Sequence, residues 1–156
     1  MSKKYELTDE TMELEGHILH RIKALRDFNY VKAGDLGGWV ESEDNLSQYE
    51  KCWLCDNAKV YGNAIVCDNA RVYDNARVCD NARIYNTKDY CIITGFGSRL
   101  SATTFFRCKD DEIRVNCGCF NGTLDEFRDK VKETHKDNKY AKEYLLAIDM
   151  VKVHFS

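Results

Sequence analysis

Apolar residues recur at every sixth position through the middle of the chain. From residue 56 the sequence reads DNAKVY, GNAIVC, DNARVY, DNARVC and DNARIY. Each hexad places an alanine at its third position and an aliphatic residue at its fifth, namely Ala58, Ala64, Ala70, Ala76 and Ala82, and Val60, Val66, Val72, Val78 and Ile84. A period of six fits neither an α-helix at about 3.6 residues nor a coiled coil at about 3.5. The pattern predicts short β-segments separated by turns, with the aliphatic and the small residue both pointing inward.

The first two residues of each hexad, Asp-Asn or Gly-Asn, predict the turns, because Asn and Gly tolerate positive φ. Side chains alternate across a β-segment, so the residues that flank each aliphatic position face outward. The period extends backward through Cys52 and Leu54, and more loosely through Leu46 and Val40.

This aliphatic-x-x-x-small-x pattern resembles the signature of the hexapeptide-repeat family. The resemblance covers about residues 35–87 and implies a short left-handed parallel β-helix of about three triangular coils, each of about 18 residues. So few coils need capping elements at both ends. The implied stacking of outward side chains places three residues beneath three others: Trp53 beneath Arg71, Lys59 beneath Arg77 and Ile65 beneath Arg83.

The flanking segments do not follow the six-residue period. Residues 4–25 alternate around a Glu15-Gly16 turn signal, which predicts a β-hairpin. Residues 103–108 and 112–117 predict two strands, and Thr123 begins a capping box that predicts a helix. A second apolar stripe beginning near Asp137 or Asn138 predicts another helix.

The sequence therefore predicts a mainly β fold in three parts. These are an N-terminal β-hairpin cap at 1–33, a left-handed β-helix at 34–100, and a C-terminal ββαα element at 101–156. The segment 34–40, with Trp39, leads into the first coil, and we expect Trp39 to plug the open end of the core.

Two further stretches resemble a narrower group of proteins. They are LHRIKALRDF…VKAGDLGGWVESEDNLS before the repeat and CGCFNGTLDEFRDKVKETHKDNKYAKEY after it. Both resemble uncharacterised hexapeptide-repeat proteins of phages and prophages. With the repeat, this resemblance covers nearly the whole chain and implies a phage-encoded protein, but it implies no settled activity.

Composition and charge limit the classes of partner that we expect the protein to bind. The 23 basic and 26 acidic residues give a net charge of −3, which argues against a dedicated nucleic-acid or anionic-membrane binder. The amino end MSKKYELTDE is polar, and we find no signal peptide or membrane span, so we expect a cytoplasmic protein, in the host cytosol if phage-encoded. In that reducing compartment the eight cysteines would remain thiols.

Catalysis is not favoured by the residue pattern. Many hexapeptide-repeat proteins are acyltransferases that use a histidine projecting from a coil as general base. Here His17, His20, His135 and His154 all lie outside the repeat. Cys52-x-x-Cys55 and Cys117-x-Cys119 could form a zinc site, but the repeat register points Cys52 inward and Cys55 outward. We therefore predict no catalytic residue, no metal and no cofactor.

Ligand binding is better supported, because arginines alternate with aromatic residues along the outward positions. Arginine forks bind phosphates and aromatic faces stack on bases, and a helix start offers free N–H groups. The alternative is that this charged ladder only keeps the coils soluble. The candidate ligand-binding residues are Trp53, Arg71, Tyr73, Arg77, Arg83, Tyr85, Arg107, Lys109, Arg114 and Thr123.

The leading hypothesis is a non-enzymatic phage accessory protein, a homotrimer, that binds a small anionic or nucleotide-type ligand or a host protein. In its most specific form it is a sponge that sequesters a nucleotide-type immune signal of the host. One alternative is a hexapeptide-repeat acyltransferase. Another is a protein–protein inhibitor or adaptor that acts through the C-terminal element.

Overall fold

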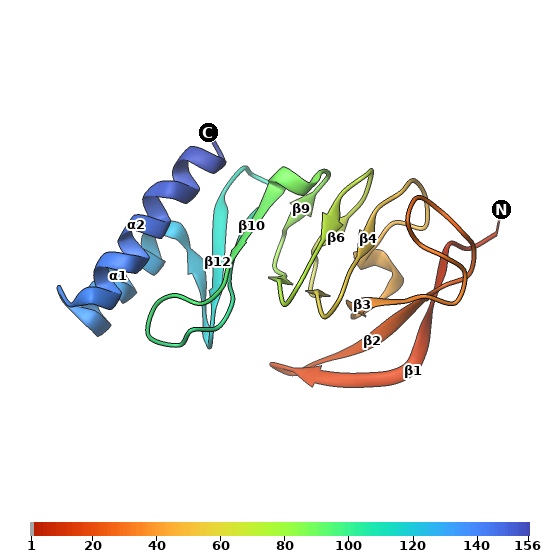
Figure 1. Cartoon of the computed structure of the whole chain (residues 1–156), viewed down its shortest axis with the longest axis horizontal. Helices are drawn as coiled ribbons and strands as arrows, with labels where there is room; N and C mark the ends of the chain where they lie inside the picture. Colours follow the sequence, from red (N-terminus) through yellow and green to blue (C-terminus); the bar gives the residue numbers. More distant parts are fainter. Residues whose placement is uncertain (1) are drawn as a thin grey trace. The chain divides into compact units, whose positions relative to one another are not determined.

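The chain forms two compact units. The computed structural model describes residues 2–156. The first unit ends at Thr87, and the second spans Lys88–Ser156. Figure 1 colours the first unit red to green and the second green to blue. Strands predominate over helices, as the sequence predicts. Among the described residues, no helix combines the length and the apolar character needed to span a membrane.

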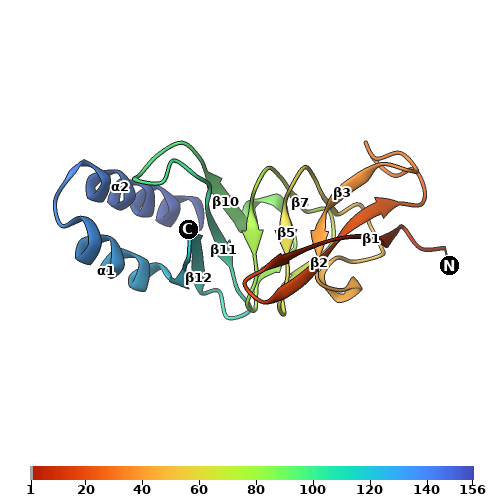
Figure 2. The same cartoon turned by 90° about the horizontal axis from the view of Figure 1, so that it is seen from below.

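The first unit begins with the predicted hairpin. Strand β1 (Tyr5–Leu14) pairs antiparallel with β2 (His17–Ala24), and both residues of the connecting turn, Glu15 and Gly16, have positive φ. Strand β3 (Leu36–Val40) then pairs antiparallel with β2 and carries the sheet toward the repeat. Figure 2 shows the long hairpin running alongside the shorter strands that follow.

The repeat forms six two-residue strands, and each of the first three pairs in parallel with the strand three places after it. They are β4 (Trp53–Leu54), β5 (Lys59–Val60), β6 (Ile65–Val66), β7 (Arg71–Val72), β8 (Arg77–Val78) and β9 (Arg83–Ile84). The pairs are β4 with β7, β5 with β8 and β6 with β9. The register confirms the predicted stacking, with Trp53 opposite Arg71, Lys59 opposite Arg77 and Ile65 opposite Arg83.

The core of these coils is made of the two inward positions of each hexad. The aliphatic residues from Val60 to Ile84 are fully buried, and the alanines from Ala58 to Ala82 are at most 1% exposed. Alanine fits because the chain turns sharply beside it and leaves little room. Burying two apolar side chains per hexad stabilises segments that make only two-residue ladders.

The first coil is longer than the others. Val40 pairs with Val60 and Leu46 bridges to Val66, so both pairs are twenty residues apart instead of eighteen. The two additional residues lie between Leu46 and Leu54, after the short 3-10 helix η1 (Glu43–Asn45). This insertion explains why the repeat is hard to follow in the sequence before residue 52.

At the corners between hexads, the residue with the left-handed backbone conformation is not the one that the sequence predicts. The residue with positive φ is the aspartate of each Asp-Asn pair, not the asparagine: Asp56, Asp68, Asp74 and Asp80 have φ between 53° and 58°, and Gly62 has 65°. At three corners a carboxylate of the coil below accepts the backbone N–H of this residue: Glu41 from Gly62 at 2.9 Å, Glu50 from Asp68 at 3.2 Å and Asp56 from Asp74 at 3.3 Å. These bonds stabilise a backbone conformation that residues other than glycine adopt at a free-energy cost.

The amino end closes the start of the coils. Lys4 is fully buried, and its Nζ donates to the carbonyl oxygens of Cys52 at 2.8 Å and Tyr49 at 3.2 Å. The hydroxyl of buried Tyr5 donates to the Leu46 carbonyl at 2.6 Å. The expectation that Trp39 plugs the core was wrong, because Trp39 pairs with Lys59 and so occupies an outward position, beneath the Arg21 guanidinium.

The second unit is a four-stranded antiparallel sheet followed by two helices. Its strands β10 (Tyr90–Ile93), β11 (Thr103–Arg107), β12 (Ile113–Cys117) and β13 (Phe120–Thr123) pair in sequence order. The helices are α1 (Leu124–His135) and α2 (Lys139–His154). The predicted ββαα element thus gains a strand on each side of its β-pair, and the unit begins at Lys88, with the 3-10 helix η2 (Thr87–Asp89) at the junction.

The helix starts follow the sequence signals. The Thr123 side chain accepts the Glu126 N–H while the Glu126 carboxylate accepts the Thr123 N–H, which confirms the predicted capping box. Asn138 caps α2 by a single bond, in which its side chain accepts the Ala141 N–H at 3.0 Å. Both helices pack on the sheet through one core that includes Phe105, Phe127 and Ile148. Figure 1 shows both helices on the same side of β12.

A candidate binding site on one face of the coils

The face formed by β4 and β7 presents an aromatic ring beside an arginine. Trp53 is only 4% exposed, because Phe28 meets its ring edge-on at 5.3 Å and Tyr5 does so at 6.3 Å. Gly37 lies so close that a Cβ there would be 2.7 Å from the indole. The indole is therefore fixed by packing, and Arg71 lies next to it in the following coil.

A tight turn from the segment between β2 and β3 covers this face. Phe28 and Val31 exchange two backbone hydrogen bonds of 2.9 and 2.8 Å, and Asn29 supplies the positive φ that so short a turn needs. Tyr30 at the tip is 78% exposed. Its ring lies under Arg71, with 4.4 Å between the guanidinium carbon and the ring centroid.

Arg71 is held from two sides. Its Nη1 donates to the Tyr73 hydroxyl at 3.3 Å, and this hydrogen bond raises the pKa of Arg71 above its ordinary value. The group is therefore a permanent cation. A guanidinium stacked on an exposed ring is stabilised by about 0.5–1 kcal/mol, enough to orient it without immobilising it.

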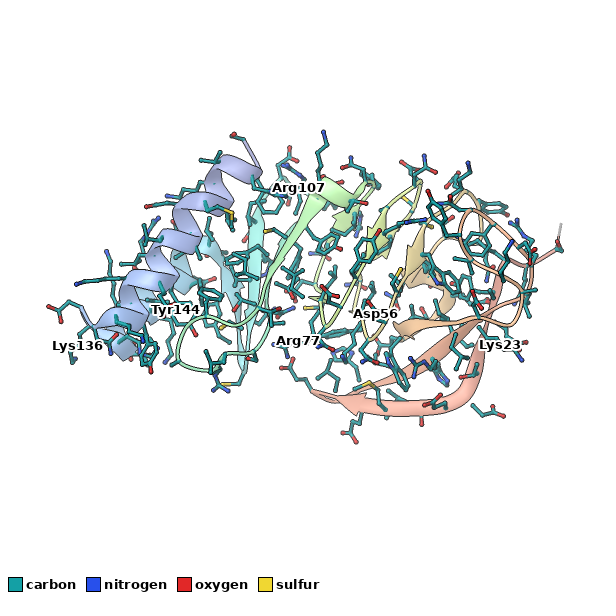
Figure 3. The ribbon with its side chains drawn as sticks, in the orientation of Figure 1. Lys23, Asp56, Arg77, Arg107, Lys136 and Tyr144 are labelled. Carbon is teal, nitrogen blue, oxygen red and sulfur yellow. The ribbon has the colours of Figure 1, made fainter. Side chains whose placement is uncertain are left out.

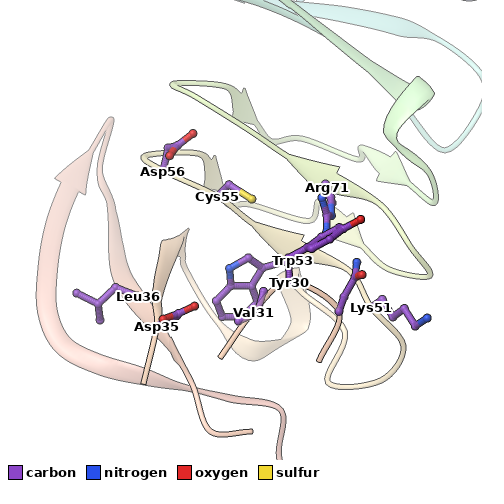
Figure 4. Close-up of a pocket in the computed structure, with 10 residues that line it drawn as sticks. Tyr30, Val31, Asp35, Leu36, Lys51, Trp53, Cys55, Asp56 and Arg71 are labelled. Carbon is purple, nitrogen blue, oxygen red and sulfur yellow. The ribbon is translucent and has the colours of Figure 1, made fainter. Parts of the chain in front are cut away.

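Tyr30, Trp53 and Arg71 line a cavity of about 320 Å³. The remaining lining residues are Asn29, Val31, Asp35, Leu36, Lys51, Cys55 and Asp56. Figure 4 shows Arg71 and Tyr30 together at one end, with Asp35 and Asp56 on the other side of Trp53. The cavity is thus polarised, with a cationic end and an acidic end separated by an indole.

Both carboxylates at the acidic end are partly engaged. Asp35 accepts the Lys32 N–H at 2.9 Å, and Asp56 accepts the Asp74 N–H at 3.3 Å. Each retains lone pairs for a ligand hydroxyl or amino group. Burial raises the pKa of Cys55, so its thiol is a poor nucleophile at neutral pH. No residue lining the cavity is a histidine, and the arrangement suits binding more than proton transfer.

Three other predicted residues of the coils lie elsewhere on the first unit. Arg77 is on the β5–β8 face, where Glu15 of the hairpin approaches its Nη1 to 3.5 Å. Figure 3 labels Arg77 close to the tip of the hairpin. Arg83 is on the β6–β9 face and donates to the carbonyl oxygens of Asn63 and Ala82, both at 2.9 Å. Tyr85, half exposed, follows β9. Of the predicted set, only Trp53 and Arg71 line the cavity.

The predicted residues of the second unit make contacts within that unit. Arg107 Nε bonds the Asp89 carboxylate at 3.2 Å, and its guanidinium lies 5.3 Å from the Phe155 ring. Lys109 is exposed in the β11–β12 turn. These contacts give Arg107 a structural role in joining the β10 end of the sheet to the end of α2.

Arg114 and Thr123 are also engaged locally. The Arg114 guanidinium bonds Glu112 at 3.4 Å and the Asn121 side chain at 3.1 Å. Thr123 caps α1, and Asp125 and Glu126 occupy its first turn. Acidic residues there already complement the helix dipole, which disfavours an anion at this end.

A histidine and a carboxylate that are far apart in the sequence meet on the β5–β8 face. His17 Nδ1 lies 2.9 Å from Glu41 Oε2, and the His17 ring is 5.0 Å from that of Tyr61. Burial alone would raise the pKa of Glu41, but hydrogen bonds from His17 and from the Gly62 N–H outweigh it and lower the pKa. The Tyr61 hydroxyl is buried and bonds no nitrogen or oxygen atom among residues 2–156; its only polar contact is with the Cys79 thiol, a weak acceptor.

Sequence reasoning missed Tyr30 and the His17–Glu41 pair. Tyr30 lies outside the repeat, and its only sequence signal is an aromatic residue after an asparagine, between Phe28 and Val31, in a segment without the six-residue period. His17 belongs to the hairpin, and only the pairing of β2 with β3 brings it over the coils. Across residues 2–156, no three histidine, cysteine or acidic side chains converge in a way that could hold a metal ion. None of the eight cysteines, all within residues 2–156, forms a disulfide.

Comparison with known proteins gives a match over part of the chain. No protein-family model matches the chain. Over 62 residues the chain is 36% identical to a protein described as "Uncharacterized acetyltransferase YdcK" from Escherichia coli (strain K12). The matched stretch is 35% of this chain and 19% of that protein, so the chain spans about a fifth of the length of the curated relative.

Proposed function

We propose that this protein is a non-enzymatic binding protein whose site is the polarised cavity between Arg71, Tyr30 and Trp53. The ligand is a small anionic molecule with a planar ring, of nucleotide type. The observation that carries this proposal is the guanidinium of Arg71 stacked on an exposed tyrosine at the edge of a 320 Å³ cavity. That volume is at the lower end of the range for small-molecule sites, about 300–1,000 Å³.

The chemistry of the two ends favours a nucleotide over a simple anion. Arg71 offers a fork for a phosphate. The exposed ring of Tyr30, with the small part of Trp53 that reaches the cavity, offers an aromatic surface for a base. Asp35 and Asp56 at the other end would accept hydrogen bonds from sugar hydroxyls or a base amino group. A plain inorganic anion would use only the cationic end.

In its specific form, the proposal is that a phage-encoded protein sequesters a nucleotide-type immune signal of its host. This form rests on the resemblance of the flanking segments to phage hexapeptide-repeat proteins. It includes a left-handed winding of the coils and a homotrimer. Size-exclusion chromatography with light scattering tests the assembly, since three copies of the 18.1 kDa chain are expected to elute together.

Isothermal titration against a panel of cyclic nucleotides and ADP-ribose derivatives tests the ligand. We expect at least one to bind at micromolar concentration, and Arg71→Gln and Tyr30→Ala each to weaken it by about tenfold or more. Arg83→Gln and Tyr49→Ala are matched controls. Arg83 occupies the same hexad position on another face, and Tyr49 is an exposed loop tyrosine outside the cavity. Absence of binding by the whole panel, or equal loss in the controls, would contradict the proposal.

Acetyl transfer is the second candidate, because two observations favour it. One is the partial identity to an uncharacterized acetyltransferase. The other is His17, which contacts Glu41 at 2.9 Å and could act as a general base with its other ring nitrogen. A thermal shift on adding acetyl-CoA, and CoA release that falls in His17→Asn but not in His20→Asn, would replace the first proposal with this one. A flat response to acetyl-CoA would remove it.

A further inference from the structure

The second unit contains a cavity of its own, of about 220 Å³, along the buried side of α1. Its walls come from α1, from Tyr144 of α2, from the loop at Ser98 and Arg99, and from the connection between β12 and β13. Phe120, Phe127 and Tyr144 supply aromatic surface, and Phe127 and Tyr144 are 3% exposed. The cavity therefore has an apolar floor that belongs to the core of the unit.

The loop that forms one wall is fixed in place. Gly97 lies flat on the Tyr144 ring, where a Cβ would be 2.3 Å from the ring carbon Cζ. The next residue, Ser98, has its Oγ 3.3 Å from His135 Nε2, and the His135 ring stacks on Tyr144 at 5.7 Å with 20° between the planes. The wall is thus built before any ligand arrives, which reduces the ordering that binding requires.

Arg99 follows directly and is positioned by its neighbours. Its guanidinium lies against the backbone of Gly118, where a Cβ would be 2.6 Å from Nε. Its Nη2 is 3.9 Å from the sulfur of Cys119, an exposed residue at the rim. Lys130 of α1 supplies a second cation to the same cavity.

The lining has cations but no carboxylate. Arg99 and Lys130 are charged, His135 is titratable, and no aspartate or glutamate is among the lining residues. An apolar cavity with a few convergent polar groups is typical of a small-molecule site. With two cations at its rim, it is complementary to a molecule with an apolar body and one anionic group.

We propose that this cavity is a second ligand site, which binds a small carboxylic acid with a single ring or a branched aliphatic body. The apolar body would lie on Phe120, Phe127 and Tyr144, and the carboxylate would pair with Arg99 and Lys130. A volume of 220 Å³ holds about seven waters at about 30 Å³ each, which suits a one-ring acid and is small for a nucleotide. The site is separate from the cavity of the first unit and does not depend on its function.

Titration of the full chain with sodium benzoate tests this proposal, with benzamide as the uncharged probe of the same shape. We expect benzoate to bind with a dissociation constant below about 1 mM, and benzamide about tenfold more weakly because it lacks the charge-assisted pair. Arg99→Gln and Lys130→Gln should each weaken benzoate by about fivefold. Lys132→Gln is the matched control, an exposed lysine of α1 outside the cavity, and should leave affinity unchanged.

A second measurement locates the ligand. Because Cys119 lies at the rim, bound benzoate should slow its alkylation by uncharged iodoacetamide, as read by peptide mass spectrometry. Far-UV circular dichroism checks that each variant is folded. The proposal is overturned if benzoate does not saturate by about 10 mM, if benzamide binds equally well, if Lys132→Gln matches Arg99→Gln, or if Cys119 is not protected.

Discussion

We predict opposite effects on stability when two buried tyrosines of the first unit are each changed to phenylalanine. Among the described residues the buried Tyr61 hydroxyl contacts only the weakly accepting Cys79 thiol, whereas the Tyr5 hydroxyl donates to the Leu46 carbonyl at 2.6 Å. Both residues are at most 2% exposed. Changing each to phenylalanine removes one oxygen and leaves the ring, so the two variants differ mainly in what that oxygen bonds.

The expected magnitudes follow from these environments. A buried polar group left unsatisfied costs about 1–3 kcal/mol. Removing the Tyr61 hydroxyl should therefore raise the free energy of unfolding, by about 1 kcal/mol once the lost contact with Cys79 is allowed for. Tyr5→Phe should lower it by about 1–2 kcal/mol, because it leaves the buried Leu46 carbonyl without this donor. The two variants should thus differ by about 2–3 kcal/mol.

Urea unfolding followed by tryptophan fluorescence is the appropriate assay. The only two tryptophans of the chain, Trp39 and Trp53, both lie in the first unit, so the signal reports that unit. With a slope of about 1–3 kcal/mol per molar urea, the midpoints of the two variants should differ by about 1 M or more. If Tyr61→Phe lowered the midpoint as much as Tyr5→Phe, the hydroxyl would have to make a bond that the structure does not show.

The pH dependence gives an independent test of the same residues. Burial raises the pKa of both Tyr5 and Tyr61 above the ordinary value of 10. The folded chain therefore holds the phenolic protons more tightly than the unfolded chain does. Stability should be unaffected by these groups below pH 10 and should fall as pH rises above it. Tyr61→Phe should make that alkaline fall shallower, and an unchanged slope would contradict the assignment.

Three further predictions concern other parts of the chain. Gly38→Ala should destabilise the first unit by about 2–3 kcal/mol in the same urea assay, because the new Cβ would be 2.3 Å from the Ala58 carbonyl oxygen, a backbone atom that cannot move aside. Because the pKa of Glu41 is lowered in the folded chain, its carboxylate stabilises the fold at pH values above the ordinary pKa of 4.5, and this contribution is lost as pH falls below that value. The free energy of unfolding of Glu41→Gln should therefore fall less steeply at acid pH. Iodoacetamide at pH 8 should modify exposed Cys119 well before Cys67, because burial raises the pKa of Cys67 to about 12; peptide mapping that found Cys67 first would refute this.

The repeat made much of the first unit predictable. A hexad fixes both which residues point inward and where the chain turns. Together with the coil of about 18 residues that the family resemblance implies, this spacing predicted the stacking of Trp53 on Arg71. The turn chemistry was harder to predict. Asn is the more tolerant residue at positive φ, yet the aspartate of each pair takes that conformation, and the carboxylate of Asp56 also accepts the N–H of Asp74 at the corner above it. A local preference for asparagine could not reveal that contact, since it joins residues eighteen positions apart.

The candidate site was only half predictable. Trp53 and Arg71 obey the repeat, but Tyr30 reaches them from a loop whose path depends on how β3 joins β2. The same holds for β10, which ends the repeat by pairing with β11 instead of a coil. Strand partners outside a periodic segment depend on tertiary packing, and the pattern of a single strand does not identify its neighbour.

The buried Lys4 has a consequence for how the coils choose their alignment during folding. Five hexads are nearly identical, so sliding the chain by one hexad would keep every Val and Ala inside and would hardly change the buried area. Burial alone therefore does not forbid such a slip. The ammonium of Lys4 can meet the carbonyls of Tyr49 and Cys52 only if the longer first coil lies directly against the amino end. The hydrogen bonds of Lys4 thus favour one register of the coils over the others, which bury nearly the same apolar surface.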